Sequence, residues 1–479
     1  MLKAGAHIHL MGICGTAMAS LAGLLKDQGF KITGSDANPY PPMSTQIEQL
    51  GIQIQKGYQA ENLNPKPDFV IVGNVISANN PEAQEVLRLN IPFTSLPKAM
   101  GEYVIAHRQS LVVSGTHGKT TTTSLLAWIL EVAGLKPGFL IGGIPKNFSY
   151  SFRNPSQDFF VIEGDEYDTA YFDKVPKFIH YKPRHVILTS VEFDHADIYA
   201  DLDAVKKSFR QLLDLIPAHG HLVACADQVH VRELLAEKDR PYPILTYGLN
   251  EGNCRVHVLP SEQEYSRFEI HLDAQSMALL KQGQTVLGPY LINMSGDYNI
   301  LNAASAVLLS LQIAVPQENI AQALKTFLGV KRRQEILGEP GGVLVIEDFA
   351  HHPTAVRETL LGIQKKYPGR KVFAVFEPRS ATSRRKIFQQ DYVKAFSSAP
   401  EVLLAQAFDQ SKIAQADRFS IEELISDLHA QGQKARGFAQ ADDIVQALKQ
   451  DTQSGDIVLI MSNGGFDGIY KKLLTALQV

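Results

Sequence analysis

A glycine-rich turn between a strand and a helix places the strongest constraint on the fold of this chain. Residues 115–121 read Gly-Thr-His-Gly-Lys-Thr-Thr, follow the apolar run Leu111–Ser114 and open a helical pattern that extends from Thr120 to Ala133. The backbone N–H groups of such a turn, together with the positive end of the helix dipole, favour a bound phosphate group. The pattern therefore predicts a nucleotide-binding loop inside an α/β domain.

The polar residues of this loop have predicted roles. Lys119 is expected to reach the β- and γ-phosphates of ATP, and the hydroxyl of Thr120 is expected to bind Mg²⁺. The position five residues before Gly118 is Val113 and not glycine, so the match is to a shorter form of the usual pattern. The predicted ATP-binding residues of the loop are Gly115, Thr116, His117, Gly118, Lys119, Thr120 and Thr121.

Three stretches of the chain each alternate short apolar runs with helical patterns, which is typical of parallel sheets with helical crossovers. They begin with the predicted strands His7–Met11, Leu111–Ser114 and Val343–Glu347. A chain of 479 residues is long enough for about three domains, each with its own core. We therefore expect a three-domain α/β protein with a Rossmann-like N-terminal domain (1–108), a central phosphate-loop ATPase domain (109–330) and a Rossmann-like C-terminal domain (331–479).

Two acidic segments follow apolar strands of the predicted central domain. Glu163 ends the strand Phe159–Glu163, and residues 192–197, Glu-Phe-Asp-His-Ala-Asp, follow the strand His185–Ser190. The carboxyl ends of parallel strands face the crevice in which ligands bind. Mg²⁺ prefers oxygen ligands and shares them with phosphates, so these carboxylates are candidate metal ligands. A histidine is a less usual ligand of Mg²⁺, and the residues alone leave the role of His195 open.

The N-terminal segment contains a second strand–turn–helix pattern, residues 9–18. It is not a complete G-x-G-x-x-G pattern, because Cys14 occupies the second glycine position. Ser35 and Asp36 end the next predicted strand, about 20 residues further on, where dinucleotide-binding folds place the acidic residue that binds ribose. The pattern favours a nucleotide diphosphate site without identifying the nucleotide.

Polar residues end two neighbouring strands of the predicted C-terminal domain. Residues 347–353 read Glu-Asp-Phe-Ala-His-His-Pro, and residues 377–380 read Glu-Pro-Arg-Ser. Histidines, an aspartate and an arginine at adjacent strand ends suit an anionic or zwitterionic substrate. The histidine pair also fits a simple helix-entry turn ahead of the proline, and the residues alone do not decide between the two interpretations.

Composition limits the partners and the compartment. The net charge is only −4, which gives no electrostatic reason to expect nucleic acid or an anionic membrane as a partner. Cys14, Cys225 and Cys254 form no CxxC pair, so neither a disulfide framework nor a structural zinc site is expected. Glycines interrupt the apolar N-terminal stretch, which argues against a signal peptide, and no long apolar run predicts a membrane span. We expect a cytoplasmic protein.

The order of these motifs resembles that of the Mur ligase family over essentially the whole chain. The matching segments are the phosphate loop, the Glu163 cluster, Asp194–His195, Asn299–Asn302 and the segment from Asp348 to Pro353. The resemblance implies three domains that bind a UDP-linked substrate, ATP and an amino substrate. It also implies an ATP-dependent ligase that activates a carboxylate as an acyl phosphate and joins it to an amine.

The resemblance assigns further roles by position. Lys119, Glu163 and His195 become the candidate catalytic residues. Thr120 is expected to bind one Mg²⁺ ion, and Glu163 and His195 are expected to bind a second. The other assigned residues are Asn299 and Asn302 for adenine, Arg333 and Asp348 for ATP near a hinge, Gly15, Thr16, Ser35 and Asp36 for UDP, and His352 and Arg379 for the incoming peptide.

Within the family, the chain resembles members that act on UDP-N-acetylmuramate. Residues 34–44, 377–380 and 461–466 resemble the members that attach the peptide L-alanyl-γ-D-glutamyl-meso-diaminopimelate in peptidoglycan recycling, and this reaction is favoured. The alternative is the attachment of L-alanine in peptidoglycan biosynthesis. The two differ in the size of the C-terminal pocket, which the sequence does not reveal, and the oligomeric state is equally open.

The implied chemistry also predicts a conformational change. Two Mg²⁺ ions and Lys119 must offset the repulsion between the attacking carboxylate and ATP. Water would destroy the acyl phosphate, so the domains are expected to close around it, with residues 325–335 as one hinge. Gln334 stands where relatives often carry an aromatic or aliphatic residue, which leaves the packing on the nucleotide open there.

Two functions of other classes compete with the ligase. A nicotinamide dehydrogenase could use the N-terminal fold, but Cys14 in the glycine pattern and the phosphate loop at residues 115–121 argue against it. A non-catalytic nucleotide-binding regulator would bind ATP without substrate-dependent release of ADP. The combined phosphate, metal and substrate positions favour the ligase over both.

Overall fold

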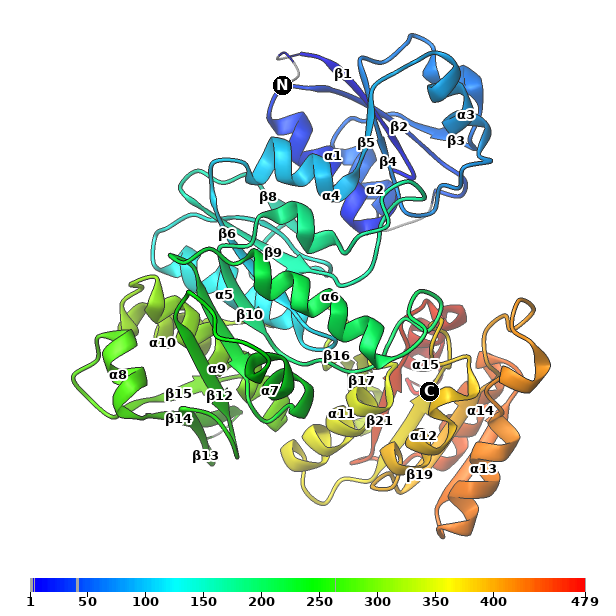
Figure 1. The fold of residues 1–479 in the computed structure, drawn as a ribbon. Helices are drawn as coiled ribbons and strands as arrows, with labels where there is room; N and C mark the ends of the chain where they lie inside the picture. Colours follow the sequence, from blue (N-terminus) through cyan, green and yellow to red (C-terminus); the bar gives the residue numbers. More distant parts are fainter. Residues whose placement is uncertain (1–2, 4, 40–42, 263, 479) are drawn as a thin grey trace.

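The chain forms three β-sheets that follow one another along the sequence. This computed structural model describes residues 3, 5–39, 43–262 and 264–478. Figure 1 shows three lobes in chain order, from the blue N-terminal lobe through the cyan and green central lobe to the yellow and red C-terminal lobe. The prediction of three α/β units is confirmed. The boundaries after residues 108 and 330 fall between the sheets and stay predictions of the domain limits.

The N-terminal sheet is parallel throughout, in the order β3-β2-β1-β4-β5. Its central strand buries Ile8 and Leu10 in one core and Met11 in a smaller one on the other side, as the alternation of a strand requires. The strands are β1 (His7–Met11), β2 (Lys31–Asp36), β3 (Ile54–Lys56), β4 (Phe69–Val72) and β5 (Phe93–Ser95). The helices are α1 (Thr16–Asp27), α2 (Met43–Gln49), α3 (Pro81–Arg88) and α4 (Leu96–Ala99), with short helical turns at Ala60–Leu63 and Met100–Ile105.

The central sheet has the order β15-β14-β13-β12-β11-β10-β6-β9-β7-β8, with a parallel centre and antiparallel pairs at both ends. The predicted antiparallel strand Phe268–Leu272 lies within β14. The strands are β6 (Gln109–Ser114), β7 (Gly138–Leu140), β8 (Phe152–Arg153), β9 (Phe159–Gly164), β10 (His185–Leu188), β11 (His221–Cys225), β12 (Ile244–Gly248), β13 (Cys254–Glu262), β14 (Tyr265–Leu272) and β15 (Val286–Ile292).

The helices of the central lobe cover this sheet. The two longest apolar helices, α5 and α9, pack against each other and share one core with the sheet. The alanines of α9 favour a helix and keep its surface small where it packs. The helices are α5 (Lys119–Val132), α6 (Leu202–Leu215), α7 (Val229–Ala236), α8 (Ala274–Leu280), α9 (Asp297–Gln312) and α10 (Gln317–Thr326), with a short turn at Lys177–Tyr181.

The C-terminal sheet has the order β16-β17-β21-β18-β19-β20 and is parallel except for β16 at its edge. Four of its strands are buried on both faces and are correspondingly apolar. The strands are β16 (Glu335–Gly338), β17 (Leu344–Asp348), β18 (Val372–Phe376), β19 (Glu401–Ala405), β20 (Lys434–Phe438) and β21 (Ile457–Met461). The helices are α11 (Pro353–Lys366), α12 (Gln389–Ala395), α13 (Ile421–Ala430), α14 (Ala441–Asp451) and α15 (Ile469–Ala476), with short turns at Pro340–Gly342, Lys386–Phe388, Gln415–Asp417 and Phe466–Gly468.

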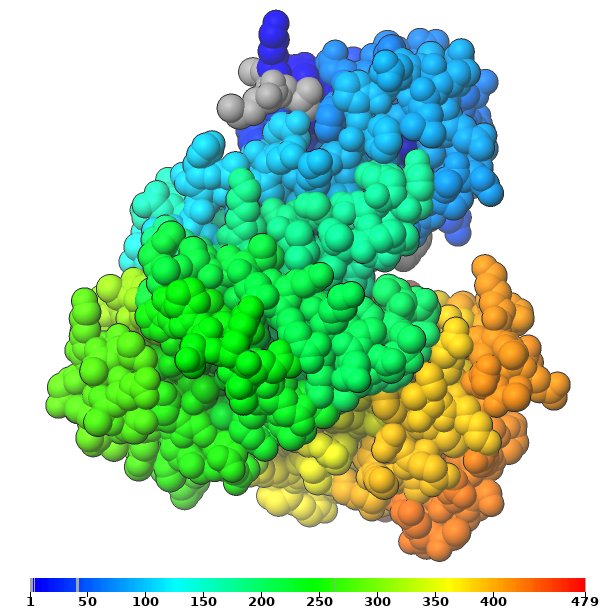
Figure 2. All heavy atoms as spheres, in the orientation of Figure 1, coloured from blue at the N-terminus to red at the C-terminus, as the bar shows by residue number. Residues whose placement is uncertain are grey.

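The lobes are arranged around an open notch. In Figure 2 this notch separates the blue N-terminal lobe from the yellow and orange C-terminal lobe, with the green central lobe beside it. Among the described residues, no helix is both long enough and apolar enough to span a membrane. Of the predicted stretch 34–44, residues 40–42 lie outside the described part of the chain.

Candidate active site

The phosphate loop lies between β6 and α5, as predicted. Gly118 has φ +83°, and a Cβ there would collide with the side chain of Asn302, so glycine is needed both for the backbone and for the space. The neighbouring strand β10 ends at Leu188, two residues earlier than predicted. The reason is that the next two residues bind the loop: Ser190 Oγ accepts a 2.9 Å bond from the His117 amide, and Thr189 Oγ1 donates to the Ser114 carbonyl at 3.2 Å.

Lys119 is the first residue of α5 and is largely buried. Its ammonium donates to the Gly115 carbonyl at 2.7 Å and to Glu166 Oε2 at 3.1 Å. Burial by itself lowers the pKa of Lys119, but the negative charges of Glu166 and Asp165 outweigh it and raise the pKa above its usual value. Lys119 is therefore a fixed positive charge at the mouth of the loop.

Thr120 and Glu163 lie together at the ends of α5 and β9. The Thr120 hydroxyl donates to Glu163 Oε2 at 3.1 Å, and the Gly142 amide donates to Glu163 Oε1 at 2.6 Å. Burial, with the negative charge of Asp165, raises the pKa of Glu163. A hydroxyl and a carboxylate beside a phosphate loop are the hard oxygen ligands that suit Mg²⁺. The two residues therefore fit a magnesium ion.

His195 reaches this region from the loop after β10, in a left-handed conformation with φ +54°. Its Nε2 lies 3.6 Å from Glu166 Oε1, and its ring packs at 4.6 Å from the ring of Tyr167. In the described part of the chain, no contact joins His195 to Glu163 directly. The shared role of these two residues in binding one ion stays a prediction.

The predicted adenine pair lies next to the phosphate loop. Asn299 and Asn302 are both buried on the first turns of α9, and Asn302 Nδ2 donates to Asn299 Oδ1 at 3.4 Å. The Asn302 side chain also lies directly against Gly118, so close that a Cβ at this position would collide with it. The fold therefore brings the start of α9 against the phosphate loop, although 184 positions separate Gly118 from Asn302 in the chain.

Arg333 and Asp348 lie where the hinge joins the C-terminal lobe. Asp348 accepts hydrogen bonds from the backbone amides of Gln334 (2.8 Å) and Ala350 (2.7 Å). The Arg333 guanidinium lies over the Phe349 ring at 4.6 Å. Burial lowers the pKa of Arg333, while the negative charges of Asp348 and Glu163 oppose that shift. Arg333 thus belongs to the same electrostatic environment as Glu163.

Gln334, whose role the sequence left open, binds protein groups on the central lobe. Its Nε2 donates to the Tyr298 hydroxyl at 2.8 Å and to the Ser295 carbonyl at 3.1 Å. Its backbone is left-handed, with φ +48°. The side chain thus fastens the hinge to the start of α9.

The predicted UDP residues surround the first turn of the N-terminal lobe but differ in accessibility. Gly15 and Thr16 are exposed at the start of α1. Asp36 Oδ2 accepts a 3.0 Å bond from the Cys14 amide and so braces the turn. Ser35 is fully buried, and its hydroxyl donates to Glu82 Oε1 at 2.7 Å, so it supports the turn from inside the lobe.

Glu82 is a site residue that the sequence reasoning missed. Its carboxylate is fully buried and is bound by His9 Nε2 at 2.7 Å, by Ser35 and by Asn62 Nδ2 at 2.8 Å. It sits in the first turn of α3, a position that in sequence is typical of a solvated acidic residue. Its burial becomes visible only when α3 is seen packed against β1 and β2, which carry His9 and Ser35.

The predicted peptide residues lie on different parts of the C-terminal lobe. His352 caps the start of α11 and lies within 3.2 Å of the Phe193 carbonyl of the central lobe. Arg379 stacks on Phe408 at 3.8 Å and pairs with Glu377 at 3.2 Å. No contact between the two is found in the described part of the chain, so a common substrate would have to span from one to the other.

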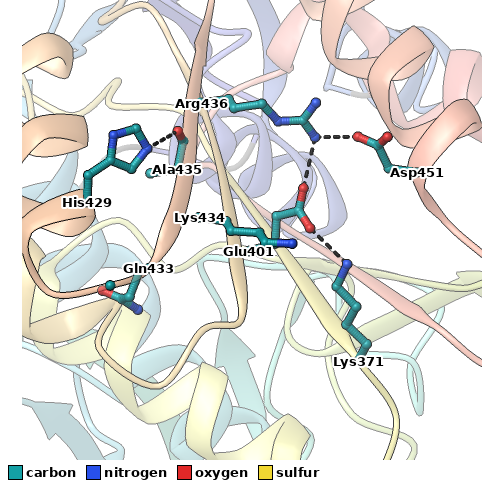
Figure 3. A pocket seen from close by; sticks show the side chains of 9 residues that line it. Lys371, Glu401, His429, Gln433, Lys434, Ala435, Arg436 and Asp451 are labelled. Atoms are coloured by element: carbon teal, nitrogen blue, oxygen red, sulfur yellow. Dashed lines mark hydrogen bonds and ion pairs between the residues drawn. The ribbon is translucent and has the colours of Figure 1, made fainter.

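A cavity on the C-terminal lobe lies away from these residues. It measures about 690 Å³ and is lined by side chains near the amino ends of β18, β19 and β20, which Figure 3 shows. Glu401 pairs with Lys371 at 2.8 Å and with Arg436 at 3.0 Å, so these charges are satisfied within the protein. Ligands of parallel sheets bind at the carboxyl ends of the strands, and we therefore place the candidate active site at the phosphate loop.

Comparison with known families agrees with this architecture along the chain. Residues 7–108 match the description "Mur ligase family, catalytic domain", residues 113–310 match "Mur ligase middle domain", and residues 332–464 match "Mur ligase, glutamate ligase domain". Each range covers most of one sheet of the structure, and the second begins within β6. The chain therefore belongs to the Mur ligase family of ATP-dependent ligases.

Individual relatives show which members of the family this chain is similar to. The chain is 40% identical over 474 residues, 98% of both chains, to the UDP-N-acetylmuramate–L-alanyl-γ-D-glutamyl-meso-2,6-diaminoheptandioate ligase of Escherichia coli. It is 32% identical to a UDP-N-acetylmuramate–L-alanine ligase of Desulfitobacterium hafniense over 97% of this chain and 98% of that one. Its structure resembles that of a murein peptide ligase of Psychrobacter arcticus, with a TM-score of 0.72, 36% identity and 99% of each chain covered.

Proposed function

We propose that this chain joins the lactyl carboxylate of UDP-N-acetylmuramate to the α-amine of L-alanyl-γ-D-glutamyl-meso-diaminopimelate, using ATP, in peptidoglycan recycling. The observation that carries the proposal is the 40% identity, over 98% of both chains, to a ligase named for that reaction. The arrangement of the phosphate loop, Glu163 and the hinge residues supports it. We propose the cytoplasm as the place of action.

The reaction has two chemical steps. The lactyl carboxylate attacks the γ-phosphate of ATP and releases ADP, which gives an acyl phosphate. The peptide amine then attacks the acyl carbon and expels phosphate. Lys119, fixed as a cation in the phosphate loop, stabilises the charge that develops on the transferred group. Thr120 and Glu163 would hold Mg²⁺, which neutralises charge on the phosphates, and a second ion near His195 is part of the proposal.

Closure of the C-terminal lobe belongs to the same proposal. Arg333 and Asp348 lie where the hinge joins the C-terminal lobe, and His352 contacts the loop after β10. Such contacts exclude water from the acyl phosphate, which would otherwise be hydrolysed. His352 and Arg379 are the proposed contacts for the peptide.

The alternative acceptor is L-alanine, which the 32% identity to alanine-adding relatives keeps in consideration. Phosphate release from ATP, Mg²⁺ and UDP-N-acetylmuramate, measured with each acceptor in turn, separates the two. We expect release with the peptide and little with alanine. Release with alanine alone would assign the biosynthetic reaction, and release with neither acceptor would refute the ligase proposal.

A further inference from the structure

Three side chains from separate segments converge where the central and C-terminal lobes meet. His117 comes from the phosphate loop, Glu192 from the loop after β10, and His352 from the start of α11. Glu192 Oε2 lies 3.3 Å from His117 Nε2 and 3.6 Å from His352 Nδ1, and the three ligand atoms all lie within 4.8 Å of one another. We call this group the seam triad.

The two separations from Glu192, 3.3 and 3.6 Å, are close to those between neighbouring ligands of a tetrahedral metal ion. Bonds of about 2.0–2.1 Å to nitrogen and oxygen place neighbouring ligand atoms about 3.3 Å apart. Two imidazoles and one carboxylate form a ligand set that suits zinc and related divalent transition metals. The predicted magnesium ligands Thr120, Glu163 and His195 instead offer two oxygen atoms and one nitrogen, so the two sets differ in chemistry.

The hydrogen bonds of His352 orient it as a ligand. Its Nε2 lies 3.2 Å from the Phe193 carbonyl, which can only accept, so Nε2 carries the proton. Its Nδ1 accepts a long 3.3 Å bond from the Thr354 amide and therefore has a lone pair. Nδ1 also lies 3.6 Å from Glu192 Oε2, and an ion between these two atoms would take the lone pair from the weak bond of the Thr354 amide. A ligand histidine whose second nitrogen donates to a backbone carbonyl is the usual arrangement at metal sites.

Glu192 is also supported from outside the triad. The Thr354 hydroxyl donates to Glu192 Oε2 at 2.7 Å. Burial by itself raises the pKa of Glu192, but the hydrogen bond and charge of His117 and the charge of His352 lower it to about 2. Burial, with the charge of His117, lowers the pKa of His352 to about 4.

We propose that His117, Glu192 and His352 bind a divalent transition-metal ion of the zinc class, with a fourth position left for water or a ligand oxygen. Two ligands belong to the central lobe and the third to the C-terminal lobe, so the ion fastens one lobe to the other. The proposal does not depend on which acceptor the ligase uses, because metal binding is measured without turnover.

The test uses Co²⁺ as the probe, because tetrahedral Co²⁺ has strong visible absorption. The full chain is stripped with a chelator and titrated with Co²⁺ in excess Mg²⁺, without nucleotide. We expect one equivalent to bind with a tetrahedral spectrum. His352→Ala and Glu192→Gln should each weaken binding about tenfold or more, and Thr354→Val, which removes only the outer hydrogen bond, about tenfold. His219→Ala, at an exposed histidine, is the matched control.

Circular dichroism establishes that each variant is folded. If one of these triad variants fails to fold, His117→Ala still removes the ligand of the phosphate loop, and Thr354→Val still removes the hydrogen bond to Glu192. A wild-type chain without a tetrahedral Co²⁺ spectrum would overturn the proposal. So would equal Co²⁺ affinity in the wild type and the folded triad variants, and the triad would then be a hydrogen-bond network only.

Discussion

Asp194 of the central lobe accepts a 2.6 Å hydrogen bond from the hydroxyl of Thr382 in the C-terminal lobe, and both side chains are buried. The same carboxylate oxygen accepts a 2.7 Å bond from the His195 amide. Burial by itself raises the pKa of Asp194, but the positive charges of His351, His195 and His352 outweigh it and lower the pKa well below its usual range. An ionised aspartate therefore joins the two lobes directly beside His195.

Removal of this link should impair closure. Thr382→Val keeps the shape of the side chain but deletes the donor to a charged acceptor, a change of about 1.5–3 kcal/mol. We expect kcat/KM for ligation to fall about tenfold or more, because 1.4 kcal/mol corresponds to a factor of ten. Phosphate release measures the effect. Thr475→Val is the control, because its hydroxyl bonds only to the Lys471 carbonyl of its own helix. Equal losses in the two variants would contradict a role in closure.

The buried Glu82 network should control binding of the UDP substrate. Glu82→Gln keeps the size of the side chain but replaces one acceptor oxygen by a donor, which leaves either Asn62 or both His9 and Ser35 without an acceptor. Such a loss destabilises the lobe by about 1–3 kcal/mol. We expect a lower Tm and a raised KM for UDP-N-acetylmuramate, with KM for ATP nearly unchanged.

Glu61→Gln provides the matched comparison for this variant, because Glu61 is exposed on the short turn that also carries Asn62. It should behave as the wild type in both measurements. A Glu82→Gln variant with unchanged KM for the UDP substrate would show that the network serves stability alone.

Arg379 should act on the peptide and not on the nucleotide. Arg379→Ala removes a guanidinium that stacks on Phe408 and lies at the end of β18. If this cation binds a peptide carboxylate, its loss should raise KM for the peptide about tenfold or more, the size of one charge-assisted hydrogen bond. KM for ATP should stay within about twofold. Arg357→Ala, an exposed arginine paired only with Glu358 at 2.9 Å, is the control. A similar rise in the KM for the peptide and in the KM for ATP would show that Arg379 supports the folding of the lobe and not peptide binding in particular.

A buried histidine pair in the central sheet predicts acid sensitivity. His185 Nδ1 and His221 Nδ1 lie 2.9 Å apart with stacked rings, so one must be the acceptor. Burial, with the charges of His221 and Arg184, lowers the pKa of His185 to about 3. Between about pH 6.5 and 3 the unfolded chain binds a proton at His185, whereas the folded chain does not. Its contribution to stability is therefore complete above about pH 6.5 and declines as the pH falls.

The variant His185→Gln tests this expectation. It keeps a polar side chain but cannot be protonated, so it should have a lower Tm than the wild type at pH 7.5, and the difference should narrow at pH 5. Thermal unfolding at several pH values measures both. His219→Gln, at an exposed position, should track the wild type throughout. A difference in Tm that stays constant with pH would contradict the assigned titration.

Local patterns predicted the elements of the fold well. The strands His7–Met11 and Ile457–Met461 have the predicted bounds, because a short strand run followed by a turn or helix is a local signal. The predicted strand His185–Ser190 was too long, since Thr189 and Ser190 turn from the sheet to bind the phosphate loop. That choice depends on tertiary partners 73 and 75 residues away in the chain, which no local pattern contains.

The residues of the site also divide into those that a local sequence pattern predicts and those that depend on tertiary packing. The loop from Gly115 to Thr121 was predictable because one strand–turn–helix unit builds it. Glu82 and Thr382 were not, because each acquires its role only when another lobe or strand packs against it. Ser35 was assigned to the UDP region on its position, and the structure adds that it acts from within the lobe through Glu82.

Lys119 is already neutralised within the protein by Glu166 and by the Gly115 carbonyl. A phosphate that accepts the third N–H of the ammonium shares Lys119 with these oxygen partners, so it competes with the resident carboxylate for the positive charge. Ligands with a single diffuse negative charge compete poorly with the resident carboxylate, whereas a polyphosphate offers several charges at once. We therefore expect the loop to favour nucleoside triphosphates over monophosphates, independently of any contact with the base.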